Sequence, residues 1–152
     1  EVARKGIHRH RELAVVGRAA PTLEVNQLFG PADEVAYGDL TLVVFWEEWC
    51  PNCQREVPKL QGYYDEMAED GLQVLAFTRI TKQSTPESVE AFVSEHGLTF
   101  PVAQEDGRIS NFFEVEGLPA AAIVQDERII WRGHPAHLNA DVLAERLADW
   151  AG

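Results

Sequence analysis

The sequence predicts an α/β fold, a sheet flanked by helices, from three segments that follow one another in the chain. Residues 41–46 contain an unbroken β-prone apolar run, residues 53–68 repeat apolar residues at helical spacing, and residues 72–78 contain a second apolar run. An apolar strand without alternating polar residues is typical of a sheet that is covered on both faces. Two such strands joined by a helix form a right-handed crossover. We therefore expect residues 41–46 to be the central strand.

Length and composition indicate one domain preceded by a short basic extension. The 152 residues are 45% hydrophobic and 25% charged, which is ordinary for a globular protein and sufficient for a buried core. Residues 1–18 carry five Lys and Arg against two Asp and Glu, and we interpret them as a solvated N-terminal extension. Residues 19–152 form the expected domain.

Charge and hydropathy exclude two classes of partner. The formal net charge is -12, and beyond residue 18 the chain has 8 basic and 23 acidic residues, so a nucleic acid partner is not expected. No apolar run approaches the roughly 20 residues that span a bilayer, and the first residues lack the apolar core of a signal peptide. Membrane contact is expected only through an anchor that precedes residue 1.

The first part of the domain has weak signals. The ordered region is expected to begin near Ala20 and Pro21, and Gly30 and Pro31 predict a turn. Residues 35–37 are a candidate short strand. The strong pattern begins only at residue 41.

The segment after the central strand predicts an amphipathic helix. Its apolar positions recur at steps of three or four, and Gly71 marks its end. Pro58 lies inside this pattern, where it removes one backbone hydrogen bond, so a kink is expected near the first turn. A helix that begins only at Pro58 is the alternative. The apolar positions are Cys53, Val57, Leu60, Tyr64, Met67 and Ala68.

A second helix is predicted after the strand 72–78. Thr85 is placed to cap it, Pro86 takes its first position, and Gly97 follows its end. Residues 99–102 are then a candidate extended piece, and residues 109–113 predict a helical turn. The expected buried stripe of the helix is Val89, Phe92 and Val93.

The last part of the domain predicts a hairpin and a helix. Pro119 precedes the apolar strand 120–124, and residues 129–132 return antiparallel to it. Asn139 is placed to cap the final helix. The hydrophobic staple and buried stripe of this helix are expected from Leu138, Leu143, Leu147 and Trp150.

Both cysteines of the chain lie in the stretch Trp49-Cys50-Pro51-Asn52-Cys53. Two residues separate them at a point where a strand ends and a helix begins, so they can open and close a disulfide with little backbone movement. A chain of this size needs no structural disulfide to fold. The spacing therefore predicts a thiol-disulfide oxidoreductase.

Further motifs accompany the cysteine pair in a fixed order. They are Ala20-Pro21, Phe45-Trp46, Glu56 with Pro58, the insert from Pro86 to Gly97 with Phe100-Pro101, Gly117-Leu118-Pro119 and a hairpin ending in Gly133. With these motifs, the chain resembles the thioredoxin superfamily, and within it the TlpA/ResA-like thiol-disulfide oxidoreductases. The resemblance covers about residues 19–150.

The resemblance implies a thioredoxin-like fold, which is a central mixed sheet of four or five strands flanked by helices. It includes an N-terminal extension and a helical insert before the strand that follows Pro119. It also implies a cis bond before Pro119, although only about 5 to 6% of X-Pro bonds in folded proteins are cis. A trans proline that opens a strand is the alternative.

Cys50 is the expected attacking thiol. An ordinary thiol is mostly protonated at neutral pH, and the amino end of a helix favours its thiolate. Cys53, one turn further along and on the buried face, is expected to resolve the mixed disulfide. Pro51 removes one backbone N-H near the sulfur, and Asn52 offers only hydrogen bonds.

The surroundings of the pair predict a reducing or intermediate poise. Strongly oxidising relatives place a histidine at the position of Asn52. The carboxylates of Glu47, Glu48 and Glu56 oppose formation of a thiolate nearby.

The resemblance leaves the acceptor of the Cys53 proton unassigned. Thioredoxin has a buried aspartate at the position of Val44, and ResA-like members can carry a glutamate at the position of Pro51. Glu47 and Glu48 are candidate acceptors that could act through a water. We interpret both mainly as solvated loop acids.

In the family, the loop that carries the cis proline faces the cysteines and pairs with the substrate chain. Leu118 is therefore expected to offer backbone hydrogen bonds by strand addition, and Pro119 to keep an N-H away from the sulfurs. Trp49 is expected to be exposed in the same groove, and Trp46 fits either the groove or the core. The candidate substrate-binding residues are Trp49, Pro51, Asn52, Leu118 and Pro119.

Three alternatives to this function stay open. A zinc site would need His134 and His137 to complete the cysteine pair, and no metal is expected because they fit a solvated loop. A peroxiredoxin-like peroxide reductase would share the fold, but such enzymes carry a single peroxidatic cysteine in a Thr-rich context. A redox-inactive interaction module with the same fold is the third.

The resemblance also implies partners and a location. Expected partners are protein thiols and disulfides, such as cytochrome c apoproteins or copper-site cysteines, and a membrane or soluble thiol reductant. No cofactor beyond the redox-active disulfide is expected. The expected location is the periplasm or the outer face of the membrane, with the cytoplasm as alternative.

Overall fold

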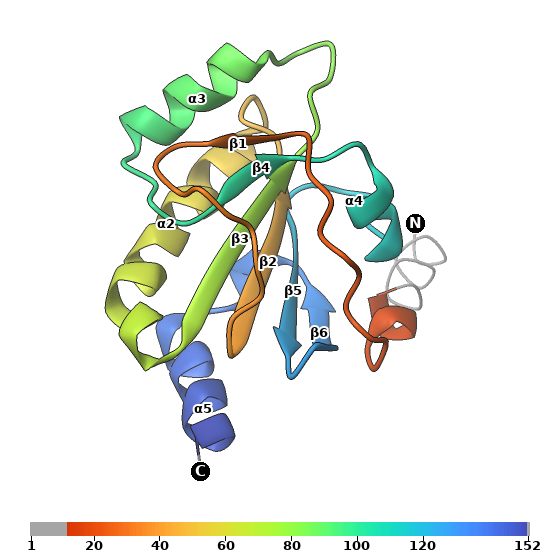
Figure 1. Cartoon of the computed structure of the whole chain (residues 1–152), viewed down its shortest axis with the longest axis vertical. Helices are drawn as coiled ribbons and strands as arrows, with labels where there is room; N and C mark the ends of the chain where they lie inside the picture. The colour runs from red at the N-terminus through yellow and green to blue at the C-terminus, as the bar shows by residue number, and fades with distance from the viewer. Residues whose placement is uncertain (1–11, 152) are drawn as a thin grey trace.

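The computed structural model describes residues 12–151, and side chains as far as residue 149. Within this part of the chain, a six-stranded sheet has the strand order β1-β4-β3-β2-β5-β6 (Figure 1). The strands are β1 (Gln27–Phe29), β2 (Leu40–Trp46), β3 (Leu72–Thr78), β4 (Val102–Gln104), β5 (Ala120–Gln125) and β6 (Arg128–Gly133).

The sheet is mixed, as predicted. β2 pairs parallel with β3 and antiparallel with β5, so it is a central strand. β4 joins β3 in parallel, whereas β1 and β6 add antiparallel at the two ends. The sheet has one strand more than the four or five that the resemblance implied, because β1 pairs with the outer edge of β4.

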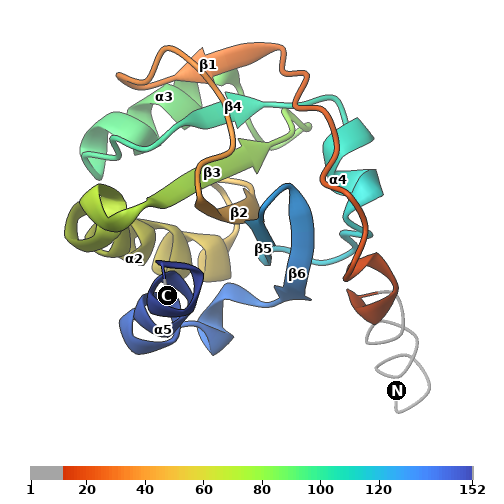
Figure 2. The same cartoon turned by 60° about the horizontal axis from the view of Figure 1, so that its bottom comes forward.

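Helices cover both faces of the sheet (Figure 2). The helices α2 (Pro51–Met67), α3 (Pro86–Glu95) and α5 (Ala140–Ala151) lie on one face, and the short α4 (Arg108–Phe112) lies on the other. The chain passes from β2 through α2 into β3, which confirms the predicted strand-helix-strand unit.

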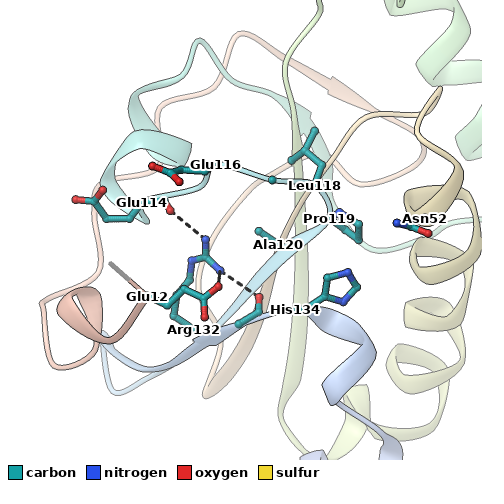
Figure 3. Close-up of a pocket in the computed structure, with 11 residues that line it drawn as sticks. Glu12, Asn52, Glu114, Glu116, Leu118, Pro119, Ala120, Arg132 and His134 are labelled. Atoms are coloured by element: carbon teal, nitrogen blue, oxygen red, sulfur yellow. Dashed lines mark hydrogen bonds and ion pairs between the residues drawn. The ribbon is translucent and has the colours of Figure 1, made fainter. Parts of the chain in front are cut away.

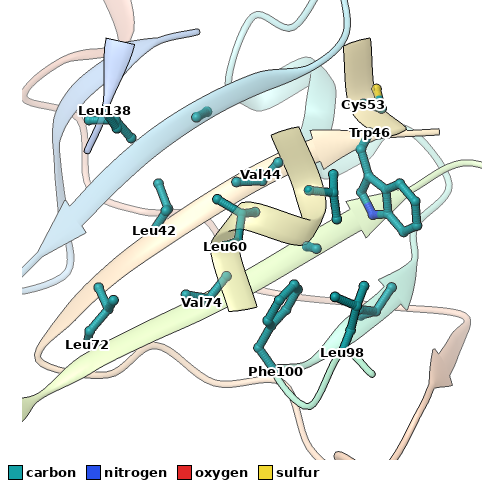
Figure 4. Close-up of a cluster of buried hydrophobic side chains, with 14 of the residues drawn as sticks. Leu42, Val44, Trp46, Cys53, Leu60, Leu72, Val74, Leu98, Phe100 and Leu138 are labelled. Atoms are coloured by element: carbon teal, nitrogen blue, oxygen red, sulfur yellow. The ribbon is translucent and has the colours of Figure 1, made fainter. Parts of the chain in front are cut away.

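The core follows the alternation of β2, whose seven residues are all buried. Leu42, Val44 and Trp46 point to the face of α2, α3 and α5 (Figure 4), and Val43 and Phe45 point to the face of α4. Each face excludes water from one set of apolar side chains, which is the main stabilising contribution to such a layer. β2 therefore ends, after Trp46, on a rigid base directly before the cysteines.

The helix α2 begins at Pro51 and contains Pro58, so the alternative start at Pro58 is wrong. Cys50 supplies the N-terminal cap that makes the earlier start stable. The helix continues as a short 3-10 turn (Ala68–Asp70), after which Gly71 has a φ of 110°. That backbone conformation strains other residues, which explains why a glycine ends the helix.

Two expectations at the β1 and β4 edge are wrong. Residues 35–37 form no strand, because Val35 and Tyr37 pack on the α4 face of the core and the Tyr37 hydroxyl donates to the Pro21 carbonyl at 2.8 Å. The strand before β2 is instead β1, whose three residues are too few to give a strand pattern in the sequence. The extended piece expected at 99–102 has the wrong bounds, because the strand β4 begins only at Val102 and the backbone N-H of Thr99 binds the Gln61 side chain at 2.8 Å instead of a neighbouring strand.

The predicted caps of α3 and α5 are confirmed. Thr85 and Ser88 form a reciprocal capping box at the start of α3. The Asn139 carboxamide oxygen accepts the N-H of Val142 at 2.9 Å, and Leu143 is fully buried. The expected burial of the Trp150 side chain lies outside the described residues.

The described part of the N-terminal extension contacts the domain. Val15 is fully buried in the core on the α4 face. Gly17 N-H donates to the Ile129 carbonyl at 2.7 Å, and Ile129 N-H donates to the Arg18 carbonyl at 2.9 Å. The basic residues before position 12 lie outside the described residues, and the boundary after residue 18 stays a prediction.

Candidate active site

Cys50 caps the amino end of α2. Its Sγ accepts the backbone N-H of Cys53 at 3.4 Å, and its carbonyl accepts the N-H of Gln54 at 2.9 Å. Pro51 takes the first helical position, where a missing N-H leaves no bond unmade. The Cys50 side chain is 8% exposed, so its sulfur lies at the positive end of the helix with limited access to solvent.

Cys53 lies one turn inside α2 and has no exposed surface. Burial raises the pKa of its thiol, and the hydrogen bond with the Cys50 side chain adds to this effect. Both thiols are free. Both sulfurs thus lie at the start of the helix, and burial opposes the ionisation of the inner one, that of Cys53.

The loop before β5 forms the opposite side of the site. The Leu118-Pro119 peptide bond is cis, as the resemblance implied. The Cys50 thiol donates to the Leu118 carbonyl oxygen across a distance of 3.9 Å. The two stretches that the sequence singled out are therefore in contact, although 68 residues separate Cys50 from Leu118.

Arg132 binds backbone carbonyls of the segment that leads into this loop. Its guanidinium donates to the carbonyls of Glu114 at 3.1 Å and Gly133 at 3.1 Å (Figure 3). It also donates to the Phe113 carbonyl at 2.8 Å. The side chain is 4% exposed, and burial lowers the pKa of the guanidinium. Glu12 approaches it to 3.8 Å from the N-terminal segment.

Glu105 holds the start of the same loop. Its buried carboxylate accepts the backbone N-H groups of Gly107, Ile109 and Ser110 and the hydroxyl of Ser110 at 2.9 Å. It therefore replaces the side-chain cap that Gly107 cannot give to α4. Sequence reasoning missed both Glu105 and Arg132, because no motif marks a charge whose partners are distant backbone groups.

A cavity of about 270 Å³ lies beside the site (Figure 3). Asn52, Leu118 and Pro119 line its end next to the cysteines. The charged and ionisable side chains on its wall are Glu12, Glu114, Glu116, Arg132 and His134. The cavity thus borders the stretch Cys50 to Cys53 at Asn52 and has an excess of carboxylates.

The two candidate proton acceptors differ in position. The expectation that Glu47 is a solvated loop acid is wrong, because its side chain is only 8% exposed. Its Oε1 accepts the Trp49 indole N-H at 3.0 Å and the Thr81 hydroxyl at 2.7 Å. Glu48 is half-buried and accepts the Ser88 hydroxyl at 3.1 Å instead.

The remaining predicted residues fall as follows. Trp49 is 40% exposed beside Cys50, as expected. Trp46 is 1% exposed and packs on the ring of Phe92 at a centroid distance of 5.1 Å, so it is a core residue. Asn52 is exposed and its side-chain oxygen accepts from Arg55.

The sequence profile of the AhpC/TSA family matches residues 16–132. The chain belongs to the AhpC/TSA family. Two relatives of this chain are named as thiol-disulfide oxidoreductases. Sporulation thiol-disulfide oxidoreductase A of Bacillus subtilis is 25% identical over 109 residues, which cover 71% of this chain and 66% of that relative.

Thiol-disulfide oxidoreductase ResA of Oceanobacillus iheyensis is 29% identical over 117 residues, or 72% of this chain and 59% of that relative. The chain thus spans about three fifths to two thirds of these relatives. A crystal structure of a thioredoxin-like superfamily protein superimposes with a TM-score of 0.74 at 21% identity, covering 88% of this chain and 96% of that one. The thioredoxin-like fold and the relationship to ResA-type proteins are therefore confirmed.

Two further observations concern metals and membranes. In the described residues, no group of three or more His, Cys, Asp or Glu side chains is arranged to hold a metal ion. His134 and His137 lie with ring centroids 6.0 Å apart, and the Nδ1 of His134 accepts the N-H of Ala136. Between residues 12 and 151, no helix is both long and apolar enough to cross a bilayer.

Proposed function

We propose that this protein is a thiol-disulfide oxidoreductase that exchanges its Cys50-Cys53 dithiol with disulfides of protein substrates, acting mainly as a reductant. One observation carries the proposal. Two free thiols lie at the start of a helix, and the attacking sulfur contacts both the Cys53 N-H, at 3.4 Å, and the Leu118 carbonyl, at 3.9 Å. This arrangement gives a nucleophile, a resolving thiol and a substrate-facing backbone within one site.

Cys50 is the proposed nucleophile. The Cys53 N-H and the positive end of α2 favour the negative charge of its thiolate. It attacks one sulfur of the substrate disulfide and forms a mixed disulfide. Cys53 then attacks Cys50, which releases the reduced substrate and leaves the Cys50-Cys53 disulfide.

The substrate chain is proposed to bind along the loop that carries Pro119. The backbone of Leu118 is available for strand addition, and Pro119 offers no N-H that could compete for the sulfurs. Trp49 supplies an exposed aromatic surface beside Cys50, and Pro51 and Asn52 are the exposed helix residues next to it. The adjacent cavity gives room for the residues that flank the substrate cysteine.

The charges near the pair support the reducing direction. Glu47 and Glu48 precede the cysteines, and Glu56 lies one turn after Cys53. Negative charges nearby destabilise a thiolate and therefore make the dithiol a better electron donor. Asn52 adds no positive charge that would offset them.

Partners and location are part of the proposal. The ResA-type relatives, which are named as thiol-disulfide oxidoreductases, support protein thiols as substrates. The proposed examples are cytochrome c apoproteins or copper-site cysteines, and the proposed electron donor is a membrane or soluble thiol reductant. The same relationship supports a periplasmic or other extracytoplasmic location.

Reduction of a protein disulfide, such as that of insulin, tests the proposal. Cys50→Ser is expected to lower the rate by about a thousandfold or more, whereas Ser94→Ala, an exposed change on α3, is expected to leave it unchanged. Full activity of Cys50→Ser would reject the function. A reduction potential near the roughly -120 mV of the strongest oxidants would reject the reducing direction. Faster turnover with hydrogen peroxide than with protein disulfides would favour the peroxidase alternative.

A further inference from the structure

Glu47 is a buried carboxylate with no chemical role in the disulfide exchange described above. We propose that Glu47, and not Glu48, accepts the proton that Cys53 must lose before it resolves the mixed disulfide. This inference rests on the proposed function. It goes beyond that function by naming the acceptor and the path of the proton.

The carboxylate of Glu47 is held in one orientation. Its Oε1 accepts two hydrogen bonds, from the Trp49 indole at 3.0 Å and from the Thr81 hydroxyl at 2.7 Å. The two donors come from the loop before α2 and from the loop after β3, so they fix the group from both sides. Among the described residues, no hydrogen bond is made to Oε2, which is therefore the atom that can take a proton.

Cys53 lies against the same residue. The backbone of Glu47 is near enough to the Cys53 sulfur to lower the pKa of its thiol, and the Cys53 side chain has no route to solvent of its own because it is fully buried. Burial raises the pKa of this thiol, and the charges of Cys50 and Glu47 raise it further. The charge of Glu47 thus acts directly on the ionisation of Cys53.

Charge conservation makes Glu47 a favourable acceptor. If the Cys53 proton left for solvent, a thiolate and a carboxylate would both be charged in a buried place, which is costly. If the proton moves to Glu47, the site keeps a single negative charge.

The other nearby carboxylates are engaged elsewhere. Glu48 accepts from Ser88 at the start of α3, and the main causes of the raised pKa of Cys53 are burial, Cys50 and Glu47. Glu56 pairs with Lys59 at 3.2 Å. Glu48 and Glu56 are only half-buried, so neither combines burial with a main effect on the Cys53 thiol.

A second cavity, of about 140 Å³, gives the proton a way out. Glu47 and Leu118 line it, and its volume leaves room for water, which occupies about 30 Å³ per molecule in the liquid. The charged groups on its wall are Arg79, Glu105 and Glu116, and the titratable groups on the α2 side of Glu47 are Cys50 and Cys53. Glu105 already accepts four hydrogen bonds around α4, so it does not compete for the proton.

The proposed step is balanced in atoms and electrons. The S-H bond of Cys53 breaks and its proton binds Oε2 of Glu47. The Cys53 thiolate attacks Sγ of Cys50, the Cys50-Cys53 disulfide forms, and the bond from Cys50 to the substrate sulfur breaks with its electron pair on the leaving thiolate. Glu47 then returns the proton to solvent or to the leaving thiolate through the cavity.

Ellman's reagent, an aromatic disulfide that releases a coloured thiolate, separates the two exchanges in stopped-flow measurements on the full chain. The first phase reports attack by Cys50, and the second reports resolution by Cys53. For Glu47→Gln, we expect a first phase at least as fast as in wild type, because a negative charge near Cys50 is lost, and a second phase slowed about tenfold or more near pH 7. The slowed phase should then rise about tenfold per pH unit, because hydroxide must remove the proton.

Controls distinguish this inference from the function it rests on. Glu66→Gln, on the exposed face of α2, removes one carboxylate far from the pair and should change neither phase. The proposed function itself would be rejected if the wild-type protein showed no first phase, or if Cys50→Ser still showed one. A second phase in Glu47→Gln within twofold of wild type, or one slowed by Glu48→Gln instead, would overturn the role of Glu47. If Glu47→Gln does not fold, Thr81→Val replaces it in the test, because this change removes one hydrogen bond to Oε1 of Glu47. A second phase of Thr81→Val that equals the wild-type one would also overturn the proposal.

Discussion

Cys50 lies between two regions that are stabilised in opposite ways. On the α2 side, regular backbone hydrogen bonds and an apolar stripe position Cys50 and Cys53. On the loop side, two buried charged side chains, Arg132 and Glu105, bind backbone groups of residues 107–114 and so position Leu118 and Pro119. The first region depends on local sequence, and the second depends on a few long-range bonds. Mutations should therefore affect chemistry on one side and stability on the other.

The largest expected effect is on the α2 side. In Cys53→Ser, the mixed disulfide on Cys50 cannot be resolved, so turnover of a protein disulfide should fall by about a hundredfold or more. A covalent complex with the substrate should accumulate and be visible by mass spectrometry. Cys50→Ser is the matched control and should form no such complex. A complex in that control would mean that the roles of the two sulfurs are reversed.

On the loop side, Arg132→Met should destabilise the protein by about 2 to 4 kcal/mol. The change leaves two buried carbonyls and one half-buried carbonyl without this donor while it keeps most of the volume. Urea unfolding measures the effect. Arg128→Met removes one exposed bond to the Gly17 carbonyl and should cost less than about 1 kcal/mol. If both variants lost the same free energy of unfolding, burial of Arg132 would not explain its effect.

The raised pKa of Cys53 links the α2 side to pH. The folded protein keeps the Cys53 thiol neutral, whereas the unfolded chain ionises it near pH 8.5. Below pH 8.5 the thiol is neutral in both states, so its ionisation takes nothing from the free energy of unfolding. Above it, the free energy of unfolding of the reduced protein should fall by about 1.4 kcal/mol per pH unit. The comparison is between reduced wild type and reduced Cys53→Ala at pH values on both sides of 8.5. Parallel stability curves would show that Cys53 is not the cause.

The smallest expected effect tests Glu105 through one of its partners. Ser110→Ala removes a hydroxyl that donates to the Glu105 carboxylate at 2.9 Å, and three backbone donors remain. We expect a loss of about 1 kcal/mol in the free energy of unfolding and an unchanged first exchange with Ellman's reagent. Ser94→Ala, exposed on α3, gives the baseline. A slowed first exchange would mean that α4 also positions the attacking thiol.

The same contrast explains what sequence could predict. Residues 41–46, the helix after Cys50 and the caps Thr85 and Asn139 follow local rules of periodicity and capping, and all are confirmed. The cis bond at Pro119 was predicted only through the family resemblance, because a base rate of about 5 to 6% would not suggest it.

What sequence missed depends on distant partners. β1 has three residues and is defined by its pairing with β4, which no local pattern reveals. Glu47 and Glu48 are identical in type and adjacent, yet only the packing of Trp49 and Thr81 shows that Glu47 is the buried one. Patterns of single residues describe elements well, but they do not describe which charges a fold encloses.

The pairing of residues 17–20 with β6 has a consequence for solubility. The N-H groups of Gly17 and Ala20 bind the carbonyls of Ile129 and Glu127, and Ile129 N-H binds Arg18, so this short segment covers part of the outer edge of the last strand. An uncovered edge offers unpaired groups to a strand of another molecule. A chain shortened to begin at Pro21 would expose that edge and should associate more readily into aggregates.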